Sequence, residues 1–354
     1  MHAITRALAA VGMALVTGIA LAQDSAILPE VDSSRCSADN RADCLNGVGS
    51  GVTSLDGLRV SGAPAARRGG GGASDEQREA MLNGGRVTGM SAGSGLLEGY
   101  SVWTGYGHSR YESTTRLGAY EGRTDALQIG VDRFWGDRFL VGVSAAYETT
   151  DNDTTFNDGE QDADGFLFAP YAVYLLNDAF SIDASVGYGR IDTDQDRINT
   201  GTGSRISSDF ESERAFGSIN LNGVVVTGEW VFGGRVGMLH AVESQDGYTE
   251  RDTTAGAGSQ ARTVGDRHVD LTQGYVSFDA AYSLGGFEPY ALIGFRRDFS
   301  RDDGRTAGGL PGGVVTQPDD RTEWEYGLGL RYFGDGVSGS LEWITTQGRE
   351  QFDN

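Results

Sequence analysis

Residues 179–191 read Ala-Phe-Ser-Ile-Asp-Ala-Ser-Val-Gly-Tyr-Gly-Arg-Ile, and this stretch decides the fold. Successive side chains of a β-strand point to opposite faces, so this stretch would present one apolar face and one small or polar face. The apolar face carries Phe180, Ile182, Ala184, Val186 and Tyr188, and the other carries Ser181, Asp183, Ser185, Gly187 and Gly189. Strands of soluble β-sandwiches alternate too, but they usually have about five or six residues. Alternation over this length is typical of a strand that crosses an outer membrane between lipid and a lumen.

The same alternation recurs along the chain from residue 99 onwards. A second clear case places Trp324, Tyr326, Leu328, Leu330 and Tyr332 opposite Glu323, Glu325, Gly327, Gly329 and Arg331. In total the pattern predicts eleven strands, at 99–110, 121–134, 138–150, 164–176, 179–191, 210–226, 229–244, 267–284, 287–299, 321–333 and 336–349.

The connections between these strands are expected to alternate between long and short. The short ones are Gly136-Asp137, Asn177-Asp178, Thr227-Gly228, Gly285-Gly286 and Gly334-Asp335. The long ones, rich in Asp, Gly, Ser and Thr, are 111–120, 151–163, 192–209, 245–266 and 300–320. Outer-membrane barrels have short periplasmic turns and longer external loops, whereas a sandwich does not demand this rhythm. The sequence therefore predicts an all-β fold, a transmembrane antiparallel up-and-down β-barrel.

Aromatic residues gather beside the short turns. Such residues form girdles at membrane–water interfaces, where an apolar ring with a polar edge fits best. A periplasmic girdle is predicted from Phe134, Trp135, Phe180, Trp230, Phe232, Tyr282, Phe287, Tyr332 and Phe333.

The first 22 residues have the pattern of a secretory signal peptide. A short basic start is followed by an apolar run from Ala7 to Leu21, and Ala20-Leu21-Ala22 offers a cleavage site between Ala22 and Gln23. The alternative, a membrane anchor, fits less well because small polar positions interrupt the run. No later stretch approaches the ~20 apolar residues of a membrane helix. An exported chain without such helices can enter a membrane only as a closed barrel. We therefore expect the bacterial outer membrane, with its lipid and lipopolysaccharide as partners.

Composition narrows the choice of function. The chain has 354 residues, a formal net charge of −22, and 55 glycines. Nucleic acid is not an expected partner, because phosphate contacts need basic patches. The glycine share is about twice the usual ~7%. In long strands, glycine is expected either as flexible filler or where the wall curves tightly.

The region before the strands reads as a tether. Residues 23–73 are too short to build a useful core and are interpreted as a disordered or vestigial passenger. Cys36 and Cys44 are expected to form one disulfide loop in an oxidising compartment, and a metal-binding pair is the weaker alternative. Ser74 resembles an N-cap that opens a short linker helix, which Asn83-Gly84-Gly85 ends. Residues 74–98 then lead into the barrel.

The alternation directs a set of charged residues inward. Buried charges must be paired or hydrated, and around a central helix they could be both. The expected lumen charges are Asp183, Arg235, Asp279, Glu325, Arg331 and Glu342. They are interpreted as hydrated wall charges, with a role in gating or passenger release as the alternative.

Motifs for catalysis and metal binding are weak. His108-Ser109, with Glu148 to orient the ring, is the candidate for a lipid-hydrolysing dyad, but adjacent residues of a strand point to opposite faces. His240 and His268 flank one long loop and could approach each other. The acids of 151–160 resemble a calcium loop, yet Phe156 stands where that loop needs glycine. We expect solvated charges there, able at most to share cations with lipopolysaccharide. No enzyme activity, cofactor or resident metal is predicted.

Several strand motifs resemble those of the autotransporter β-domain family. The first strand, 100–107, reads Tyr-Ser-Val-Trp-Thr-Gly-Tyr-Gly, and the second, 124–132, reads Thr-Asp-Ala-Leu-Gln-Ile-Gly-Val-Asp. Gly294-Phe295-Arg296 and the segment 327–332 are similar to later strands of the family, so the resemblance covers 99–354. It implies a twelve-stranded translocator barrel, a helix passing through the pore before the first strand, help from the barrel-assembly machinery, and display of an N-terminal passenger.

Three features depart from that family pattern. No segment before Ser74 is large enough to be a surface enzyme, so the passenger is minimal. In some family members the linker helix is cut at two adjacent asparagines, whereas Asn83 is followed here by glycine. Only eleven strands are visible, although bacterial barrels usually have an even number. We expect a truncated last strand; alternatively 86–97 supplies the twelfth, although its glycines make a poor strand.

The sequence thus predicts an outer-membrane translocator barrel that displays or exports its own N-terminal segment. The alternatives are a small pore, an adhesin working through its external loops, or an outer-membrane lipid hydrolase.

Overall fold

The computed structural model describes the strand region and leaves most of the N-terminal quarter outside. The described residues are 90–92, 100–113, 120–136, 138–154, 158–177, 179–199, 202–254, 261, 263–302, 321–334, 337–348 and 352–353. The predicted signal peptide, the Cys36–Cys44 loop and the linker helix at 74–84 lie outside them. Among the described residues, no helix is long and apolar enough to cross a membrane.

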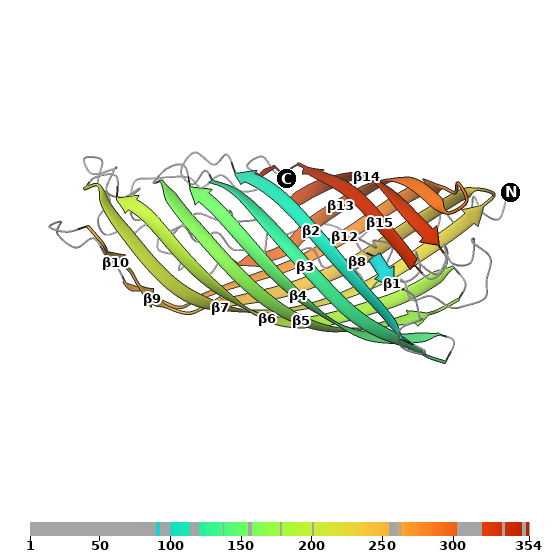
Figure 1. Cartoon of the computed structure of the whole chain (residues 1–354), viewed down its shortest axis with the longest axis horizontal. Coiled ribbons are helices and arrows are strands. Elements are labelled where there is room, and N and C mark those ends of the chain that lie inside the picture. The colour runs from blue at the N-terminus through green and yellow to red at the C-terminus, as the bar shows by residue number, and fades with distance from the viewer. Residues whose placement is uncertain are drawn as a thin grey trace.

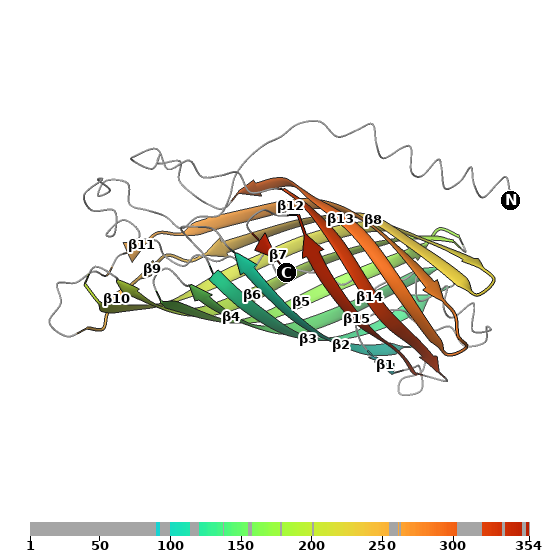
Figure 2. The same cartoon turned by 90° about the horizontal axis from the view of Figure 1, so that it is seen from above.

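Eleven long strands form a single antiparallel sheet that curls round on itself (Figures 1 and 2). Each long strand pairs with the next long strand along the chain, which is the up-and-down topology predicted from the sequence. The strands are β2 (Ser101–Ser113), β3 (Tyr120–Trp135), β4 (Phe139–Thr154), β5 (Gly159–Leu175), β6 (Phe180–Asn199), β7 (Ser204–Thr227), β8 (Trp230–Gln245), β12 (Arg267–Tyr282), β13 (Phe287–Asp302), β14 (Thr322–Gly334) and β15 (Val337–Gln347).

The strand ends that flank the five predicted short turns all lie at one end of the barrel, which we call the short-turn end. The opposite end is the loop end. Two loops there are shorter than predicted, because the expected loops 151–163 and 192–209 are mostly strand. Only positions 155–158 and 200–203 separate β4 from β5 and β6 from β7. Alternation continues in these segments with polar residues: Thr193 and Gln195 are buried, while Asp192 and Asp194 are exposed. Strands that extend beyond lipid need no apolar outer face. Their polar composition is therefore that of a loop, and the sequence analysis did not identify them as strands.

Beyond the end of β8, the chain continues along the free edge of β7. Short strands β9 (Tyr248–Thr249), β10 (Arg251–Asp252) and β11 (Thr263–Val264) follow, with β10 paired to β7 and β11 paired to β9. We call the part of β6 and β7 beyond Arg190 and Glu213, together with β9–β11, the outer extension. It is the protruding part at the loop end in Figure 1.

The two ends of the sheet meet at a seam between β15 and β2. Strand β1 (Met90–Ala92) lies in this seam and pairs antiparallel with both neighbours, so that Met90 is opposite both Gly339 and Thr104. Nearer the loop end, β16 (Phe352–Asp353) pairs with the last residues of β2. Three residues of 86–97, the stretch considered as an alternative twelfth strand, therefore stand in the wall.

The outer face of the barrel is apolar over its middle. Along β6 the side chains of Phe180, Ile182, Val186 and Tyr188 are exposed, as the alternation predicts. Beside the short turns, Trp135, Phe180, Trp230, Phe232, Tyr282, Phe287 and Tyr332 are exposed, whereas the side chains of Phe134 and Phe333 lie outside the description. Trp230 meets Tyr282 edge-on with ring centroids 5.1 Å apart, and Phe287 packs on Tyr332 at the same separation.

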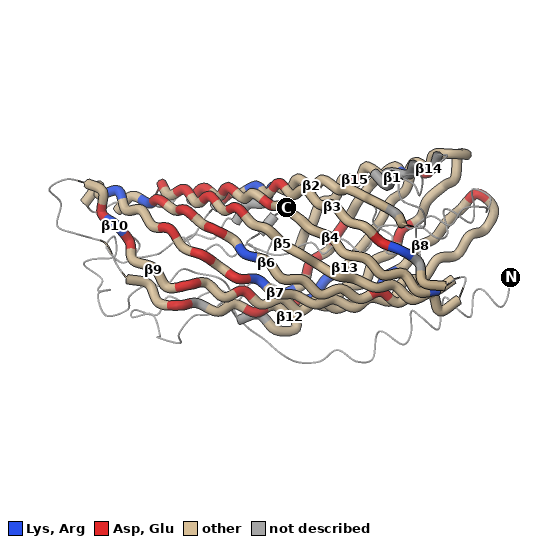
Figure 3. The backbone as a smooth tube through the Cα atoms, turned by 60° about the horizontal axis from the view of Figure 1, so that its bottom comes forward, with Lys and Arg blue, Asp and Glu red and all other residues tan. Residues whose placement is uncertain are grey.

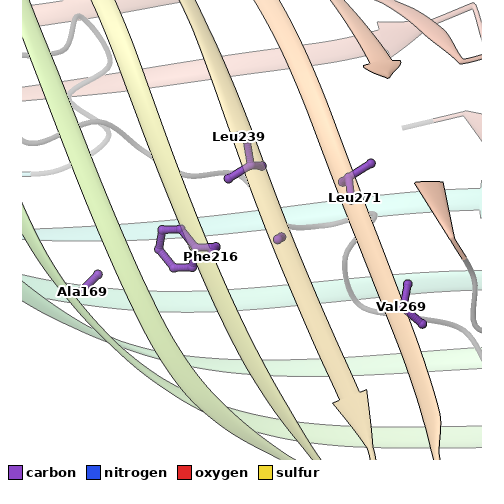
Figure 4. Close-up of a cluster of buried hydrophobic side chains, with 6 residues drawn as sticks. Ala169, Phe216, Leu239, Val269 and Leu271 are labelled. Atoms are coloured by element: carbon purple, nitrogen blue, oxygen red, sulfur yellow. The ribbon is translucent and has the colours of Figure 1, made fainter. Parts of the chain in front are cut away.

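Apolar side chains on the inner face gather in three buried clusters. The cluster in Figure 4 joins β5, β7, β8 and β12 through Ala169, Phe216, Leu239, Ala241, Val269 and Leu271. The other two lie towards the short-turn end, around Val231 and around Leu140, and Leu175 packs against both. The lumen is therefore not purely polar: apolar patches alternate with the charged groups described next.

Candidate functional site in the barrel lumen

The six charged residues directed inward by the alternation all lie on the inner face of the wall. Asp183, Glu325 and Arg331 are buried, and Arg235, Asp279 and Glu342 are partly buried. Each has a bonded partner on another strand. These contacts run along the wall, transverse to the strands, and several span more than one strand. We call a side-chain contact between strands that are not adjacent a cross-strand brace.

Arg331 of β14 is the centre of the first brace. Its guanidinium donates to Glu288 of β13 at 3.2 Å and to Asp279 of β12 at 3.1 Å. It also stacks over the ring of Tyr290, 4.0 Å from the centroid. The Tyr290 hydroxyl donates to Glu342 of β15 at 2.7 Å. This one group of side chains therefore connects four strands, β12 to β15.

Glycine makes the Tyr290–Glu342 contact possible. Gly329 of β14 lies in register between the two residues, and a Cβ atom on it would overlap the Tyr290 ring. The ring can cross the intervening strand only because that position has no side chain. Glycine here has a role that the sequence analysis did not name: it allows the close approach of a side chain from a neighbouring strand.

A second brace connects β2 to β5 near the short-turn end. Trp103 Nε1 donates to the Tyr171 hydroxyl at 2.8 Å, and that hydroxyl donates to Asp132 of β3, also at 2.8 Å. Trp103 lies across Gly130, and Tyr171 lies across Gly142. All three bonded side chains are buried.

A third brace follows one row of the sheet from β12 to β6. Tyr275 crosses Gly237 of β8 and donates its hydroxyl proton to Asn220 of β7. Asn220 donates in turn to Asp183 of β6 at 2.8 Å. The neighbouring Asn222 also donates to Asp183, at 2.7 Å, and accepts from Arg235 at 2.7 Å. Asp183 is thus held by two amides.

The fourth brace lies nearer the loop end. Arg214 of β7, 1% exposed, bonds its register neighbour Glu243 at 3.0 Å and reaches Glu148 of β4 at 2.8 Å. Gly165 of β5 leaves room for Glu148, because a Cβ there would press on that side chain. Between adjacent strands, Arg296 donates to Glu325 at 3.0 Å.

Sequence reasoning found part of this network and missed the rest. It identified single inward charges from strand parity, but not the partners Trp103, Asp132, Glu148, Arg214 and Glu288. One pattern could have indicated these contacts. Where a lumen-facing glycine stands opposite a lumen-facing aromatic residue on the adjacent strand, the aromatic side chain can cross the glycine and contact the strand beyond it. Reading that pattern requires the strand register, which one sequence does not supply.

The histidines considered for catalysis lie on the outer face. His108 bonds Asp125 through Nδ1 at 2.8 Å. The adjacent Ser109 points to the opposite face by strand parity. Glu148, expected as a possible partner of His108, bonds Arg214 on the inner face, so that expectation was wrong. His240 bonds Thr272 at 2.9 Å, and His268 bonds Ser244 at 3.0 Å. Both lie on strands β8 and β12 rather than in a loop.

Three acids of 151–160, Asp151, Asp153 and Glu160, also lie on strands, contrary to the expected loop, and Asp158 lies in the turn between β4 and β5. Asn152 is buried, while Asp151 and Glu160 face outward with Asp162. Figure 3 shows acidic residues along the loop-end parts of β5–β7. Asp162 lies beyond the apolar belt. Partial burial, with a contact from Asp151 and nearby like charges, raises the pKa of its carboxyl.

A curled sheet of long strands with an apolar exposed belt and a polar braced lumen is an outer-membrane β-barrel. The model of the autotransporter β-domain family matches residues 102–342, and the chain belongs to this family. Domains of this family are transport domains of the outer membrane.

Two solved structures illustrate the similarity of fold. The translocator domain of autotransporter NalP from Neisseria meningitidis has 15% sequence identity and a TM-score of 0.60, over 76% of this chain and 85% of that one. The β-domain of the Bordetella autotransporter BrkA has 18% identity and a TM-score of 0.56, over 72% of this chain and 95% of that one. No curated protein sequence matches the chain.

Proposed function

We propose that this barrel carries its own short N-terminal segment to the cell surface. Membership of the autotransporter family supplies the class of activity. The particular observation that supports it is the direction of β1. The minimal passenger is the stretch 23–73, which follows the predicted signal peptide.

Strand β1 runs towards the short-turn end. It is antiparallel to β2, which starts at that end, so Met90 lies farther from the short turns than Ala92. Short turns face the periplasm in outer-membrane barrels. Strand β1 therefore enters the wall from the side of the cell exterior. That direction is what display of an N-terminal segment requires.

The lumen wall supports the same proposal. Its described charges are held by braces along the wall, so a passing chain would meet polar groups that are already fixed in place. The linker helix expected at 74–84 would then plug or cap the lumen, with hydrogen bonds to the wall. We propose no catalytic role for the barrel. Its assembly partners would be the barrel-assembly machinery, with outer-membrane lipid and lipopolysaccharide around the finished barrel.

A short epitope tag tests the display proposal in intact cells. The tag is placed after Ser25 of the full-length protein, and accessibility to antibody and to added protease is measured before and after permeabilisation. We expect the tag to be accessible in intact cells. Matched controls carry the tag at Gly285-Gly286, which should be hidden, and at 255–260, which should be exposed. A tag at residue 25 that behaves like the one at 285 would contradict display.

A loop-based binding surface is the second candidate function, and the outer extension favours it. Within the extension, Arg197 and Glu250 form an ion pair at 2.8 Å, with side chains 4% and 2% exposed. Phe210 stacks on Tyr248 at 4.8 Å between ring centroids. A folded region of this kind, held together by side-chain contacts outside the membrane, can present a defined surface for binding. Removing residues 247–266 should leave display of the tag intact under the main proposal. Loss of cell-surface adhesion with display intact would favour the second candidate.

A further inference from the structure

The brace centred on Arg331 contains three oxygen atoms that have no hydrogen-bond partner among the described residues. They are Oε1 of Glu288, Oε1 of Glu342 and Oγ of Ser340, and all three are shielded from solvent. The second carboxylate oxygen of each acid is bonded. Glu288 accepts from Arg331 at 3.2 Å. Glu342 accepts from the Tyr290 hydroxyl at 2.7 Å. A buried acceptor without a donor costs stability, so a group of three at one place requires a physical reason.

The three residues lie in adjacent rows on the lumen face of the sheet. Glu288 of β13, Arg331 of β14 and Ser340 of β15 are register neighbours and form one row. Glu342 stands in the next row of the same face, opposite Gly329, which has no side chain to separate it from the rest. The oxygens without partners therefore gather beside one guanidinium and are not scattered round the wall.

The charges at this place in the lumen are unbalanced. Three carboxylates stand beside the single guanidinium of Arg331, namely those of Asp279, Glu288 and Glu342. Other lumen acids are better matched: Arg214 bonds two carboxylates, and Asp183 accepts from two amides. Buried charges are normally paired or hydrated. One positively charged donor would correct both the excess negative charge and the unused acceptors.

We infer that this group of side chains is a binding site for an organic cation that carries N–H donors, a guanidinium or a primary ammonium group. We call the group the acceptor cluster, and its members are Asp279, Glu288, Arg331, Ser340 and Glu342. Carboxylates bind such cations through charge-assisted hydrogen bonds. A guanidinium fits best, because its planar fork of N–H groups can serve several acceptors at once. A metal ion is the poorer occupant, since the part of the chain that the structure describes has no group of three or more His, Cys, Asp or Glu side chains placed to hold one.

The acceptor cluster lies near the short-turn end of the lumen. Glu288 is the second residue of β13, directly after the Gly285-Gly286 turn, and short turns face the periplasm in outer-membrane barrels. Ser340 and Glu342 are partly exposed, whereas Glu288 is 0% exposed. The ligand therefore meets the β15 side of the cluster first. Because the oxygen atoms themselves are shielded, binding requires the side chains of Ser340 and Glu342 to turn towards it.

Thermal unfolding of the full-length barrel tests the inference, with loss of heat-modifiable mobility on gels as the readout. A ligand that binds only the folded barrel raises the melting midpoint by mass action. The probe is agmatine, which carries a guanidinium and an ammonium group. The control is hexamethonium, which has the same charge but no N–H donor. We expect agmatine to raise the midpoint, and hexamethonium at equal concentration to leave it unchanged.

Three variants show whether the acceptor cluster causes the response. E342Q and S340A each remove one acceptor from the cluster, so each should reduce the rise in midpoint that agmatine produces. E342Q keeps the size of the side chain, and S340A provides the second measurement if E342Q folds poorly. The matched control is E211Q, because Glu211 has an exposed side chain on the outer face. E211Q should show the full rise.

A second probe distinguishes a free cation from an arginine side chain of a polypeptide. It is a capped tripeptide with arginine between two glycines, compared with the same peptide carrying glutamine. A rise with agmatine alone assigns the site to a free cation, a rise with the peptide alone assigns it to a polypeptide, and a rise with both assigns it to either source. No rise with either guanidinium probe, an equal rise with hexamethonium, or an undiminished rise in both E342Q and S340A would overturn the inference. The site does not depend on the proposed display, which the epitope tag tests separately.

Discussion

The wall from β2 through β8 to β15 and the seam that joins its ends are built differently. Along the wall, strands of 11 to 24 residues pair over nearly their whole length, and braces connect strands that are not adjacent. At the seam, a strand of three residues joins β15 to β2, and none of the braces described above crosses it. We refer to the first region as the braced arc.

This difference indicates which part of the barrel wall can open locally. Stability within a protein is not uniform, and regions with few contacts open at lower free energy than the rest. The braced arc is expected to persist as a unit, whereas the seam can open and close locally. The seam is also where β1, the first described strand, joins the barrel. Under the proposed function, the weakest part of the wall would coincide with the part next to the passenger.

Removing Arg331 should produce the largest loss. In R331A the buried Glu288, 0% exposed, and Asp279 lose their cationic partner. Breaking one side of a buried pair typically costs about 3–5 kcal/mol. Unfolding in urea from lipid vesicles measures the change. The control is R190A: Arg190 has an exposed side chain 3.5 Å from Glu211, and such surface pairs contribute below about 1 kcal/mol. Equal losses in the two variants would mean that the brace does not stabilise the arc.

A proline in each region compares arc and seam directly. L221P removes an N–H from β7, which is paired on both sides to β6 and β8, and should cost about 3 kcal/mol or more. S91P removes the same group from β1, which is also paired on both sides. We expect a much smaller effect on global unfolding for S91P, because the seam opens before the arc does. If S91P destabilises the barrel as much as L221P, the seam is part of the cooperative core.

The role of the lumen glycines gives a smaller, sharper test. In G329A the added methyl group would overlap the Tyr290 ring and displace the brace. We expect the free energy of unfolding to fall by about 1–3 kcal/mol. G107A adds the same group to the seam edge of the lumen, where nothing lies within 4 Å. We expect G107A to be neutral or slightly stabilising. The melting temperature of heat-modifiable mobility on gels measures both variants, and equal shifts would show that glycine acts here only through backbone freedom.

The faces and the topology of the barrel could be predicted because they depend on residues that are close together in the sequence. Phe180 to Tyr188 alternate with small residues, so lipid and lumen faces follow from a local rule. The short turns follow from dipeptides such as Gly285-Gly286. The loop-end parts of β6 and β7 could not be predicted in the same way. There Thr193 and Gln195 replace apolar residues, and a polar strand resembles a loop in composition.

The braces were beyond a single sequence for a different reason. Trp103 and Tyr171 are 68 positions apart, and Arg214 and Glu148 are 66 apart. Their contact depends on register, on curvature and on the glycine between them, none of which is a local property. The seam was considered only as an alternative, because the glycines at 89, 93 and 95 argued against a strand. The structure places β1 at 90–92, between the glycines at 89 and 93.

Amide hydrogen exchange of the full-length barrel in lipid nanodiscs tests the contrast between arc and seam most directly. The account predicts the slowest exchange in β6 and β7, between Ala184 and Asn222. It predicts the fastest exchange among the amides of long strands at Gly105–Ser109 and Ser340–Ile344, the seam edges of β2 and β15 that pair with neither β1 nor β16. Exchange there should accelerate in S91P, whereas exchange in β7 should stay unchanged. Uniform protection around the ring, or equal acceleration of β7 in S91P, would contradict it.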